Sequence, residues 1–395
     1  MKIALIIRRL NTRGGAQRQA LELARELKKR GHVVTLYTFA YSKKDCFESL
    51  LEGMRVVVWE ERKKRGFSLG SFFEENRRAK ELALQIDKDT DLLQPHDQVA
   101  YRVAAYYKKM VKNIPSVWMM NDVPTRAYAE WYGRQIHPAF RVPFFKRLTN
   151  WLMDFYDRRN FISTQDAIAV LDNFNKENVM RFLGRDAVVV RSGLGIAAFR
   201  FVEHLSPHRG DVRLLTMGIF MRHRRFEDVI EAVKILQGRG INARLTIIGD
   251  QNNDKKYAEE MKTLVKEKGL ESRVSFLGRV SEEELVAGYQ NNHIFIFAND
   301  PQTWGLAVFE AMACGTPVIV SRGAGAHEVL TDRDTALLVP PRSPEKIAMA
   351  IESLITDPAF YTSLSHRGRA FVEKNMDWKK YADGMERLCI SATKK

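Results

Sequence analysis

Residues 293–320 read HIFIFANDPQTWGLAVFEAMACGTPVIV. An apolar run at 293–298 is followed by a largely apolar helical segment and then by a second apolar run at 316–320. Neither run alternates polar with apolar residues, and uninterrupted runs are typical of strands that are buried on both faces of a parallel sheet. The stretch therefore predicts a strand–helix–strand unit of an α/β fold.

The same unit recurs along the chain. In the C-terminal half, strands are expected at 212–218, 243–250 and 274–278, and helices at 226–237, 256–268 and 281–290. Near the N-terminus, 3–7 and 33–39 read as strands around a helix at 16–29. Two such series predict two doubly wound, Rossmann-like domains.

A polar stretch, HLSPHRGD at 204–211, separates the two series. We expect an N-terminal domain at 1–204, a linker at 205–211 and a C-terminal domain at 212–370, because 395 residues exceed one ordinary core. The last segment, 371–395, is expected to be helical and to return to the N-terminal domain.

The net charge of +15 is unevenly distributed. Residues 1–200 hold 36 Lys and Arg against 22 Asp and Glu, whereas the remaining residues are nearly balanced. A one-sided excess suggests contact with phosphate groups, an anionic membrane surface or nucleic acid, and the alternative is a solubilising basic face. No recognisable nucleic-acid-binding motif accompanies the charge, so nucleic acid is not expected as a partner.

Composition also indicates the cellular compartment of the protein. No apolar stretch reaches the roughly 18 residues that a membrane span needs. The three cysteines, Cys46, Cys314 and Cys389, share no metal-like spacing and cannot all pair, which favours a reducing compartment. We therefore expect a cytoplasmic protein.

One carboxylate, Glu310, stands in the otherwise apolar helical segment 306–313. A buried carboxylate needs partners, because an unpaired one is costly or gives up its charge. Either a structural donor meets Glu310, or the helix points it at a ligand.

Several loops at expected strand ends suit an anionic ligand. Gly14-Gly15 opens the first helix, without the spacing of a dinucleotide fingerprint, and a simple tight turn is the alternative. Arg222, Arg224 and Arg225 follow a strand, where guanidinium groups suit a diphosphate, unless the loop is merely solvated. Trp304-Gly305-Leu306 begins a helix whose free N–H groups can hold an anion. No metal-spaced cluster or nucleophile elbow accompanies them, so no metal or cofactor is expected.

Taken together, these motifs resemble the retaining GT-B glycosyltransferases of family 4. The resemblance covers nearly the whole chain and is strongest over 212–345, through LTIIGD, FLGRVSEEEL, FIFAND, GLAVFEAMACGTPVIVS and ALLVPP. It implies two Rossmann-like domains facing each other across a cleft, with a nucleotide-diphosphate sugar bound mainly by the second and an acceptor mainly by the first.

The resemblance also implies roles for individual residues. Glu310 matches the second Glu of the family's EX7E motif, which holds the donor ribose. Arg224 falls where the family has a diphosphate-binding Lys. The remaining donor-binding positions are Gly15, Gly305 and Leu306 near the phosphates, Arg222 and Arg225 as further phosphate donors, and Gly278, Arg279 and Val280 near the base.

Three positions depart from the family pattern. The first Glu of EX7E is Gln302, the Arg after the loop glycine is Ile219, and the His near the transferred sugar is Asn121, beside Asp122. Gln302 and Asn121 can still bind hydroxyls but carry no charge, and with Arg224 they are the candidate catalytic residues. A non-catalytic sugar-nucleotide-binding subunit is therefore the alternative, and a UDP-sugar epimerase would share the architecture.

The implied reaction is a retaining, metal-independent transfer of a hexose from a UDP- or GDP-sugar to a glycan or a lipid-linked acceptor. Residues 139–159 place seven large apolar side chains at helical spacing among basic residues. This segment predicts an amphipathic helix that reaches an anionic membrane surface, which would make the protein peripheral, or else a stripe of ordinary core residues.

Overall fold

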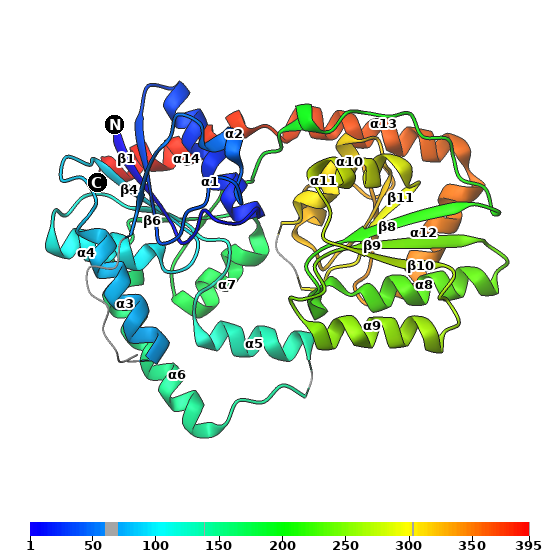
Figure 1. The fold of residues 1–395 in the computed structure, drawn as a ribbon, viewed down its shortest axis with the longest axis horizontal. Coiled ribbons are helices and arrows are strands. Elements are labelled where there is room, and N and C mark those ends of the chain that lie inside the picture. The colour runs from blue at the N-terminus through cyan, green and yellow to red at the C-terminus, as the bar shows by residue number, and fades with distance from the viewer. Residues whose placement is uncertain (60–69, 138, 302–303, 395) are drawn as a thin grey trace. The chain divides into compact units, whose positions relative to one another are not determined.

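The computed structural model describes residues 1–59, 70–137, 139–301 and 304–394, and they form two compact units (Figure 1). Unit 1 comprises Met1–Trp131, Phe140–Gly193 and Trp378–Lys395. Unit 2 comprises Tyr132–Ala139 and Leu194–Asp377. Residues 205–211, where the sequence predicts a linker, lie inside unit 2.

Unit 1 is built on a parallel sheet in the order β3-β2-β1-β4-β5-β6-β7. The strand β1 pairs with both β2 and β4, so successive strands are added first on one side of β1 and then on the other. This is the topological switch point of the sheet. The strands are β1 (Lys2–Ile7), β2 (Val33–Thr38), β3 (Arg55–Val58), β4 (Leu92–His96), β5 (Val117–Met119), β6 (Ala167–Val170) and β7 (Val188–Val189).

Helices cover both faces of this sheet. A buried cluster packs α3 and α4 onto β1 and β4, while α1, α7 and α14 pack on the other face. The helices are α1 (Gly15–Lys29), α2 (Glu48–Leu51), α3 (Gly70–Ala83), α4 (Ala100–Met110), α6 (Phe144–Asp157), α7 (Asn173–Leu183) and α14 (Trp378–Thr393), and α5 (Arg126–Ile136) runs from unit 1 into the segment assigned to unit 2.

Unit 2 repeats the plan with the sheet order β10-β9-β8-β11-β12-β13, again parallel. Its strands are β8 (Val212–Met217), β9 (Ala243–Ile248), β10 (Val274–Gly278), β11 (Ile294–Phe297), β12 (Val318–Ser321) and β13 (Leu337–Val339). Its helices are α8 (Phe226–Gly238), α9 (Lys255–Glu267), α10 (Glu282–Asn291), α11 (Leu306–Ala313), α12 (Pro344–Thr356) and α13 (Pro358–Asn375).

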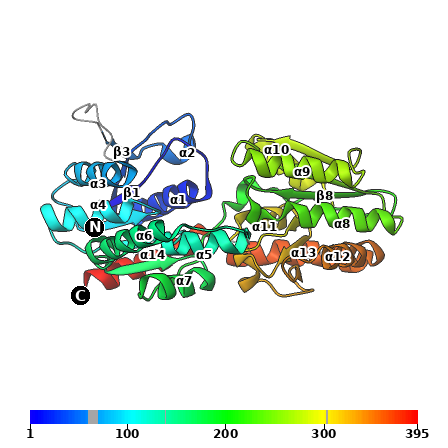
Figure 2. The same ribbon diagram turned by 90° about the horizontal axis from the view of Figure 1, so that it is seen from below.

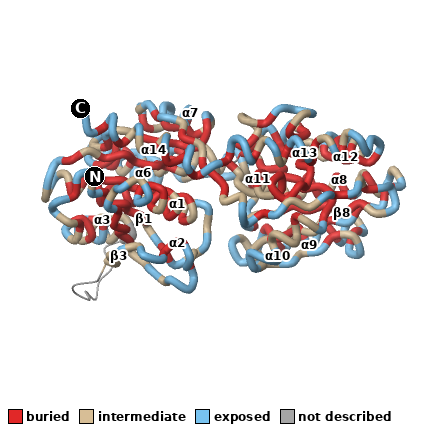
Figure 3. Tube along the Cα trace, turned by 90° about the horizontal axis from the view of Figure 1, so that it is seen from above, coloured by how far each residue is buried: buried red, intermediate tan, exposed pale blue. Residues whose placement is uncertain are grey.

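The apolar strands of unit 2 are buried because helices lie on both sides of them. The helices α8, α9 and α12 enclose the larger core cluster, and α10 and α11 lie on the other side of the sheet in Figure 1. Figure 3 shows the buried residues gathered inside each unit. The expected α/β architecture of two Rossmann-like domains is confirmed, and the expected elements of the C-terminal half match the observed ones to within about two residues at most ends.

Local signals explain several helix ends. Asp172, Asp254 and Asp357 each accept a hydrogen bond from a backbone N–H of the first turn of the helix that follows. Ser281 and Glu284 form a capping box at the start of α10. The helices α1 and α11, in contrast, begin at glycines with no side-chain cap.

The C-terminal helix α14 packs in unit 1 against α1 (Figure 2). Its buried face includes Tyr381, Met385 and Cys389. Glu386 accepts a hydrogen bond from Arg30 and pairs with His32, both at 2.7 Å. The three cysteines of the chain are free and buried.

The helix α6 presents its aromatic face to solvent, so the alternative that this stripe is ordinary core is wrong. Phe144 and Phe145 are 75% and 79% exposed, and Trp151 is 57% exposed. Only Asp154 and Asp157 of this helix are buried. In the described ranges of the chain, no helix is long and apolar enough to cross a membrane.

Candidate functional site

The strands β8 and β11 are neighbours in the sheet of unit 2, although two strands and their helices separate them in sequence. The loop 218–225 leaves the carboxyl end of β8, and the loop that starts at 298 leaves the carboxyl end of β11. Ligands of open α/β sheets bind at such a switch point, so these two loops define the candidate donor site.

The guanidinium of Arg224 lies at this switch point, and no described residue serves as its counter-ion. In the part of the chain that the structure describes, it has no hydrogen-bond or ion-pair partner, and its Nε is buried. Its guanidinium carbon lies 5.9 Å from the centre of the Phe297 ring. Because burial removes water and no carboxylate replaces it, the pKa of Arg224 is lowered to about 10.

Close packing at a glycine gives Arg224 this position. A Cβ atom on Gly218 would lie 2.7 Å from the Cδ and Nε atoms of Arg224. The absence of a side chain at Gly218 therefore lets Arg224 lie against the end of β8.

The two neighbouring arginines are bound to carboxylates. Arg222 donates from Nη2 to both carboxylate oxygens of Glu260 at 2.6 Å. Arg225 forms a bidentate pair with Asp228, at 2.9 and 2.7 Å, and contacts Glu227. Of the three arginines expected to bind phosphate, Arg224 is therefore the one that has no carboxylate partner among the described residues.

The start of α11 lies beside Arg224. Gly305 adopts φ +94° as the N-cap, and a Cβ there would lie 2.7 Å from Cε1 of Phe297. Gly305 and Arg224 thus lie against the same aromatic ring, and only glycine fits that backbone without strain. The first N–H groups of α11, beginning at Leu306, have no side-chain cap. A guanidinium and an uncapped helix N-terminus close together form an anion-binding arrangement.

Glu310 has a structural donor. Its Oε2 accepts a hydrogen bond from the Tyr289 hydroxyl at 2.9 Å, and Tyr289 is fully buried. Burial, and then the nearby Glu310 carboxylate, raise the pKa of Tyr289 well above its ordinary value. Tyr289 therefore remains a neutral donor and fixes the direction of the Glu310 carboxylate.

Two further polar groups are buried at the same strand ends. Asn299, which follows β11, is 2% exposed, and its Nδ2 has no partner among the described residues. His223 is also buried with an unpartnered Nδ1, and burial, then the charge of Arg224, lower its pKa to about 3. Unsatisfied buried polar atoms are uncommon in folded proteins, and their position beside Arg224 marks a site for a polar ligand or water.

The corner before α11 is held by residues that are distant in sequence. Tyr132, in the segment Tyr132–Ala139, donates to the Pro301 carbonyl at 3.0 Å. Arg342 donates to Asp300 Oδ2 and to the Gln135 carbonyl, both at 2.6 Å. Arg342 itself has φ +55°, which is rare for a residue other than glycine. The segment Tyr132–Ala139 therefore supports the loop from which α11 begins.

The other expected donor residues are less closely grouped. Gly278 ends β10 with φ +70°, and Arg279 is exposed beside the half-buried Val280. Ile219 is 44% exposed. Gln302 lies outside the described residues.

Gly15 and Asn121 belong to unit 1. Gly15 is the first residue of α1, whose N-cap Gly14 has no side-chain hydrogen bond. Asn121 follows β5, and its Nδ2 is buried without a partner in the ranges described. Its carbonyl accepts from Asn175 Nδ2 at 3.2 Å.

Sequence reasoning missed Asn299, Tyr132 and Arg342. Asn299 could have been found, because polar residues directly after a buried strand lie at the ligand-binding edge of the sheet. Tyr132 and Arg342 carry no local signal, since their contacts join parts of the chain that are far apart. Across the described ranges, no group of three His, Cys, Asp or Glu side chains could hold a metal ion.

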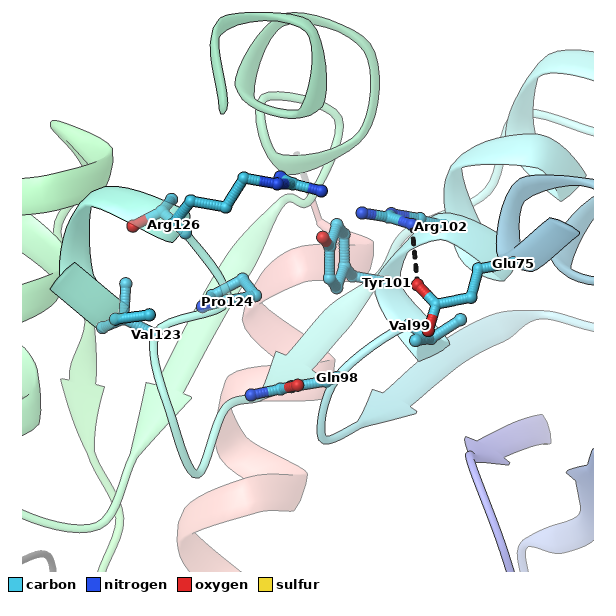
Figure 4. A pocket seen from close by; sticks show the side chains of 10 residues that line it. Glu75, Gln98, Val99, Tyr101, Arg102, Val123, Pro124 and Arg126 are labelled. Atoms are coloured by element: carbon cyan, nitrogen blue, oxygen red, sulfur yellow. Dashed lines mark hydrogen bonds and ion pairs between the residues drawn. The ribbon is translucent and has the colours of Figure 1, made fainter. Parts of the chain in front are cut away.

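Unit 1 contains a cavity of about 240 Å³ at the carboxyl ends of β4 and β5. Figure 4 shows Arg102 and Arg126 pointing toward each other, with Tyr101 between them. Gln98 and Glu75 also line it. The sequence does not indicate this cavity, because its residues come from α3, α4, α5 and the loops that follow β4 and β5.

Two family models match the chain. Glycosyltransferase Family 4 matches residues 13–189, and Glycosyl transferases group 1 matches residues 202–388. The matches leave only the two ends of the chain and a short stretch, 190–201, uncovered.

Curated relatives and solved structures agree with the two family matches. The chain is 29% identical over 175 residues to D-inositol 3-phosphate glycosyltransferase of Pseudarthrobacter chlorophenolicus, a match covering 44% of this chain and only 41% of that relative. It is 21% identical to glycogen synthase of Mycobacterium tuberculosis, over 96% of this chain and 91% of the relative.

Among solved structures, Anabaena HepE in complex with UDP and glucose has a TM-score of 0.75 at 18% identity, covering 99% of this chain and 100% of that one. Sucrose-phosphate synthase of Thermosynechococcus elongatus has a TM-score of 0.75 at 21% identity, covering 99% and 98%. At these identities the structures show a shared fold. With two parallel-sheet units and both family models matched, the chain belongs to the GT-B glycosyltransferases of the family 4 type.

Proposed function

We propose that this glycosyltransferase moves a hexose from a nucleotide-diphosphate sugar to an acceptor hydroxyl, with retention of configuration. The observation that carries the proposal is the Arg224 guanidinium, which has no partner among the described residues and lies beside the uncapped start of α11. A diphosphate fits this arrangement because it offers the anionic oxygens that both groups lack. Structural neighbours solved in complex with UDP and with UDP-glucose, and a relative that is a GDP-mannose-dependent mannosyltransferase, support this class of donor.

In this proposal each donor group has one task. Arg224 and the N–H groups from Leu306 onward bind the diphosphate. Glu310, oriented by Tyr289, accepts hydrogen bonds from the ribose hydroxyls. The stretch Gly278–Val280 contacts the base, and the backbone of Gly15 is a further proposed phosphate contact.

The chemical step breaks the bond between the sugar's anomeric carbon and the diphosphate oxygen. The bonding electrons leave with the nucleoside diphosphate, the sugar becomes oxocarbenium-like, and the acceptor oxygen forms its bond on the same face. The acceptor proton passes to the departing phosphate oxygen. Negative charge grows on that oxygen, so Arg224 and the α11 N-terminus stabilise the transition state more than the bound substrate. Protein groups supply this charge, and we therefore propose a metal-independent reaction.

The acceptor is proposed to be a glycan or a lipid-linked sugar. The exposed aromatic face of α6 supports a lipid-linked acceptor, because large apolar side chains and nearby basic groups together favour an anionic membrane surface. The basic residues beside that face are the exposed Arg141, Lys146 and Arg159.

Calorimetry with UDP, GDP and ADP tests the donor site. We expect one nucleotide to bind wild type and to bind Arg224→Ala and Glu310→Ala more weakly. Binding of none of the three by folded protein would refute the proposed donor. A nucleotide that binds, while its sugar conjugate is neither transferred nor hydrolysed, would instead identify a non-catalytic binding subunit.

Two further measurements address the reaction and the membrane. NMR of the product should show the donor's anomeric configuration, and activity should survive EDTA.

Flotation with anionic vesicles should recover wild type but not Trp151→Glu. The control Leu84→Glu, at a residue 52% exposed on another part of unit 1, should float like wild type.

A further inference from the structure

The Tyr289 hydroxyl lies between two acceptors. Its oxygen is 2.9 Å from Oε2 of Glu310 and 2.8 Å from Sδ of Met217. A phenol has one proton to donate, so only one of the two acceptors can receive it at a time. A thioether sulfur is a weak acceptor and a carboxylate is a strong one. Glu310 therefore takes the hydrogen bond while Met217 is unmodified.

The three side chains come from three elements of unit 2. Met217 is the last residue of β8, Tyr289 lies in α10, and Glu310 lies in α11. Tyr289 is fully buried, and its ring packs edge-to-face on Phe295 with the ring centres 5.5 Å apart. Because the hydroxyl is buried, bulk water does not replace a partner that Tyr289 or Glu310 loses there.

Met217 is more accessible than the tyrosine that it contacts. It is half-buried, and the next residue, Gly218, begins the loop that borders the candidate donor site. Met312, within α11, is in contrast only 1% exposed. Susceptibility to oxidation rises with exposure, so a small oxidant reaches the sulfur of Met217 more readily than that of Met312.

Oxidation changes what this sulfur offers to Tyr289. Hydrogen peroxide transfers one oxygen atom to Sδ: the O–O bond breaks, an S–O bond forms, the sulfur loses two electrons, and the remaining oxygen leaves as water. The product, methionine sulfoxide, is polar where the thioether was apolar. Its oxygen accepts hydrogen bonds and competes with Glu310 for the single Tyr289 proton. A reductase that oxidises two thiols to a disulfide reverses the step and releases the oxygen as water.

We propose that Met217 is an oxidation site that controls donor binding through the Tyr289 hydrogen bond. In the oxidised chain, the sulfoxide oxygen accepts the Tyr289 proton, and the lone pairs of the tyrosine oxygen then face the Glu310 carboxylate. Two oxygens with no proton between them repel, so Glu310 turns away from the direction in which Tyr289 had held it. The inference rests on the proposed role of Glu310 in binding the ribose, and it adds regulation of that site by hydroperoxides.

The test compares nucleotide affinity of the full chain before and after treatment with hydrogen peroxide. Calorimetry gives the ratio of the two Kd values for the nucleotide that untreated wild type binds, and peptide mass spectrometry gives the extent of oxidation at Met217. Oxidised wild type should bind about 10- to 150-fold more weakly, the range for losing a hydrogen bond to a charged group. Methionine sulfoxide reductase with dithiothreitol should restore the affinity.

Four variants assign the effect to Met217 and to Tyr289. Met217→Leu keeps the size and apolar character of the side chain but has no sulfur, so its affinity should not change on treatment. Tyr289→Phe removes the shared proton, so its affinity should be lower at the start and should not fall further. Met180→Leu, at a residue of α7 that is 53% exposed, and Met221→Leu, at a residue of the donor loop that is 37% exposed, should lose affinity as wild type does.

Three results would overturn the inference. If Met217 stays unoxidised while Met180 is oxidised, the sulfur is out of reach. If Met217 is oxidised and nucleotide affinity is unchanged, Tyr289 still holds Glu310. An equal loss of affinity in Met217→Leu or in Tyr289→Phe would place the effect outside this hydrogen bond. In all three cases, nucleotide binding by untreated wild type leaves the donor proposal standing, whereas untreated wild type that binds no nucleotide refutes both.

Discussion

At the scale of single residues, the three arginines at the end of β8 should respond differently to substitution. Arg224→Ala should weaken nucleotide binding about 10- to 150-fold, because a hydrogen bond to a charged group contributes about 1.5–3 kcal/mol. The nucleotide affinity of Arg224→Lys should lie between those of wild type and Arg224→Ala, because lysine keeps the charge but lacks the planar guanidinium. Calorimetric titration measures both.

Arg225→Ala is the matched control for that prediction. Its guanidinium is paired with Asp228, so nucleotide affinity should stay near the wild-type value while thermal stability falls. Equal losses of affinity in the two alanine variants would mean that Arg224 has no special role. From sequence the adjacent arginines were equivalent, and only their observed partners separate them.

His96 should make unit 1 sensitive to acid. This residue is fully buried, its ring nitrogens have no partner among the described residues, and burial lowers its pKa to about 3. The unfolded chain protonates near pH 6.5 and the folded one does not, so stability falls as pH drops below about 6.5. At pH 5.5 the loss should be about 1.4 kcal/mol.

Thermal unfolding of wild type and His96→Gln at pH 7.5 and 5.5 checks this. The variant should be less stable at pH 7.5 if the glutamine packs poorly, but its loss between the two pH values should be smaller. If wild type and His96→Gln lose the same stability between pH 7.5 and pH 5.5, then protonation of His96 is not coupled to unfolding.

At the scale of elements, the segment Tyr132–Ala139 should affect donor binding, although it begins inside the helix α5, whose first residues belong to unit 1. Tyr132→Phe removes the hydrogen bond to the Pro301 carbonyl and should weaken nucleotide binding about 2- to 10-fold. Tyr41→Phe, at a tyrosine 38% exposed, should have no effect. If both variants bind nucleotide like wild type, the segment is a structural support only.

The helix α14 allows burial to be compared with ion pairing in one place. Met385→Ala empties a fully buried site and should cost about 2–5 kcal/mol. Glu386→Ala removes partly exposed pairs with Arg30 and His32 and should cost about 1 kcal/mol or less. Denaturant unfolding decides between them, and a larger loss for Glu386→Ala would show that the ion pairs, rather than burial, attach the C-terminal helix.

At the scale of the whole molecule, two sheets with separate cores predict two unfolding transitions. The proposed nucleotide contacts lie mostly in unit 2. Nucleotide at one hundred times its Kd should therefore stabilise unit 2 by about 2.7 kcal/mol and raise the temperature of its transition. Met385→Ala should lower the temperature of the unit 1 transition. Differential scanning calorimetry measures both shifts, and a single transition that moves with either change would indicate one cooperative unit instead.

The sequence by itself determined the fold and the position of the donor loops. Uninterrupted apolar strands, glycine turns and helical periodicity are local properties, so the strands and helices around 293–320 could be placed without coordinates. They also placed Arg224 and Gly305 in loops that follow strands, and Glu310 in the helix that begins after Gly305.

Only the tertiary structure decided which of these groups are available to a ligand. Glu260 and Asp228 neutralise two arginines, Tyr289 orients Glu310, and Arg342 and Tyr132 support the start of α11. The exposure of α6 and the cavity near Gln98 were decided in the same way. Each depends on contacts between segments far apart in the chain, and local sequence patterns carry no information about such contacts.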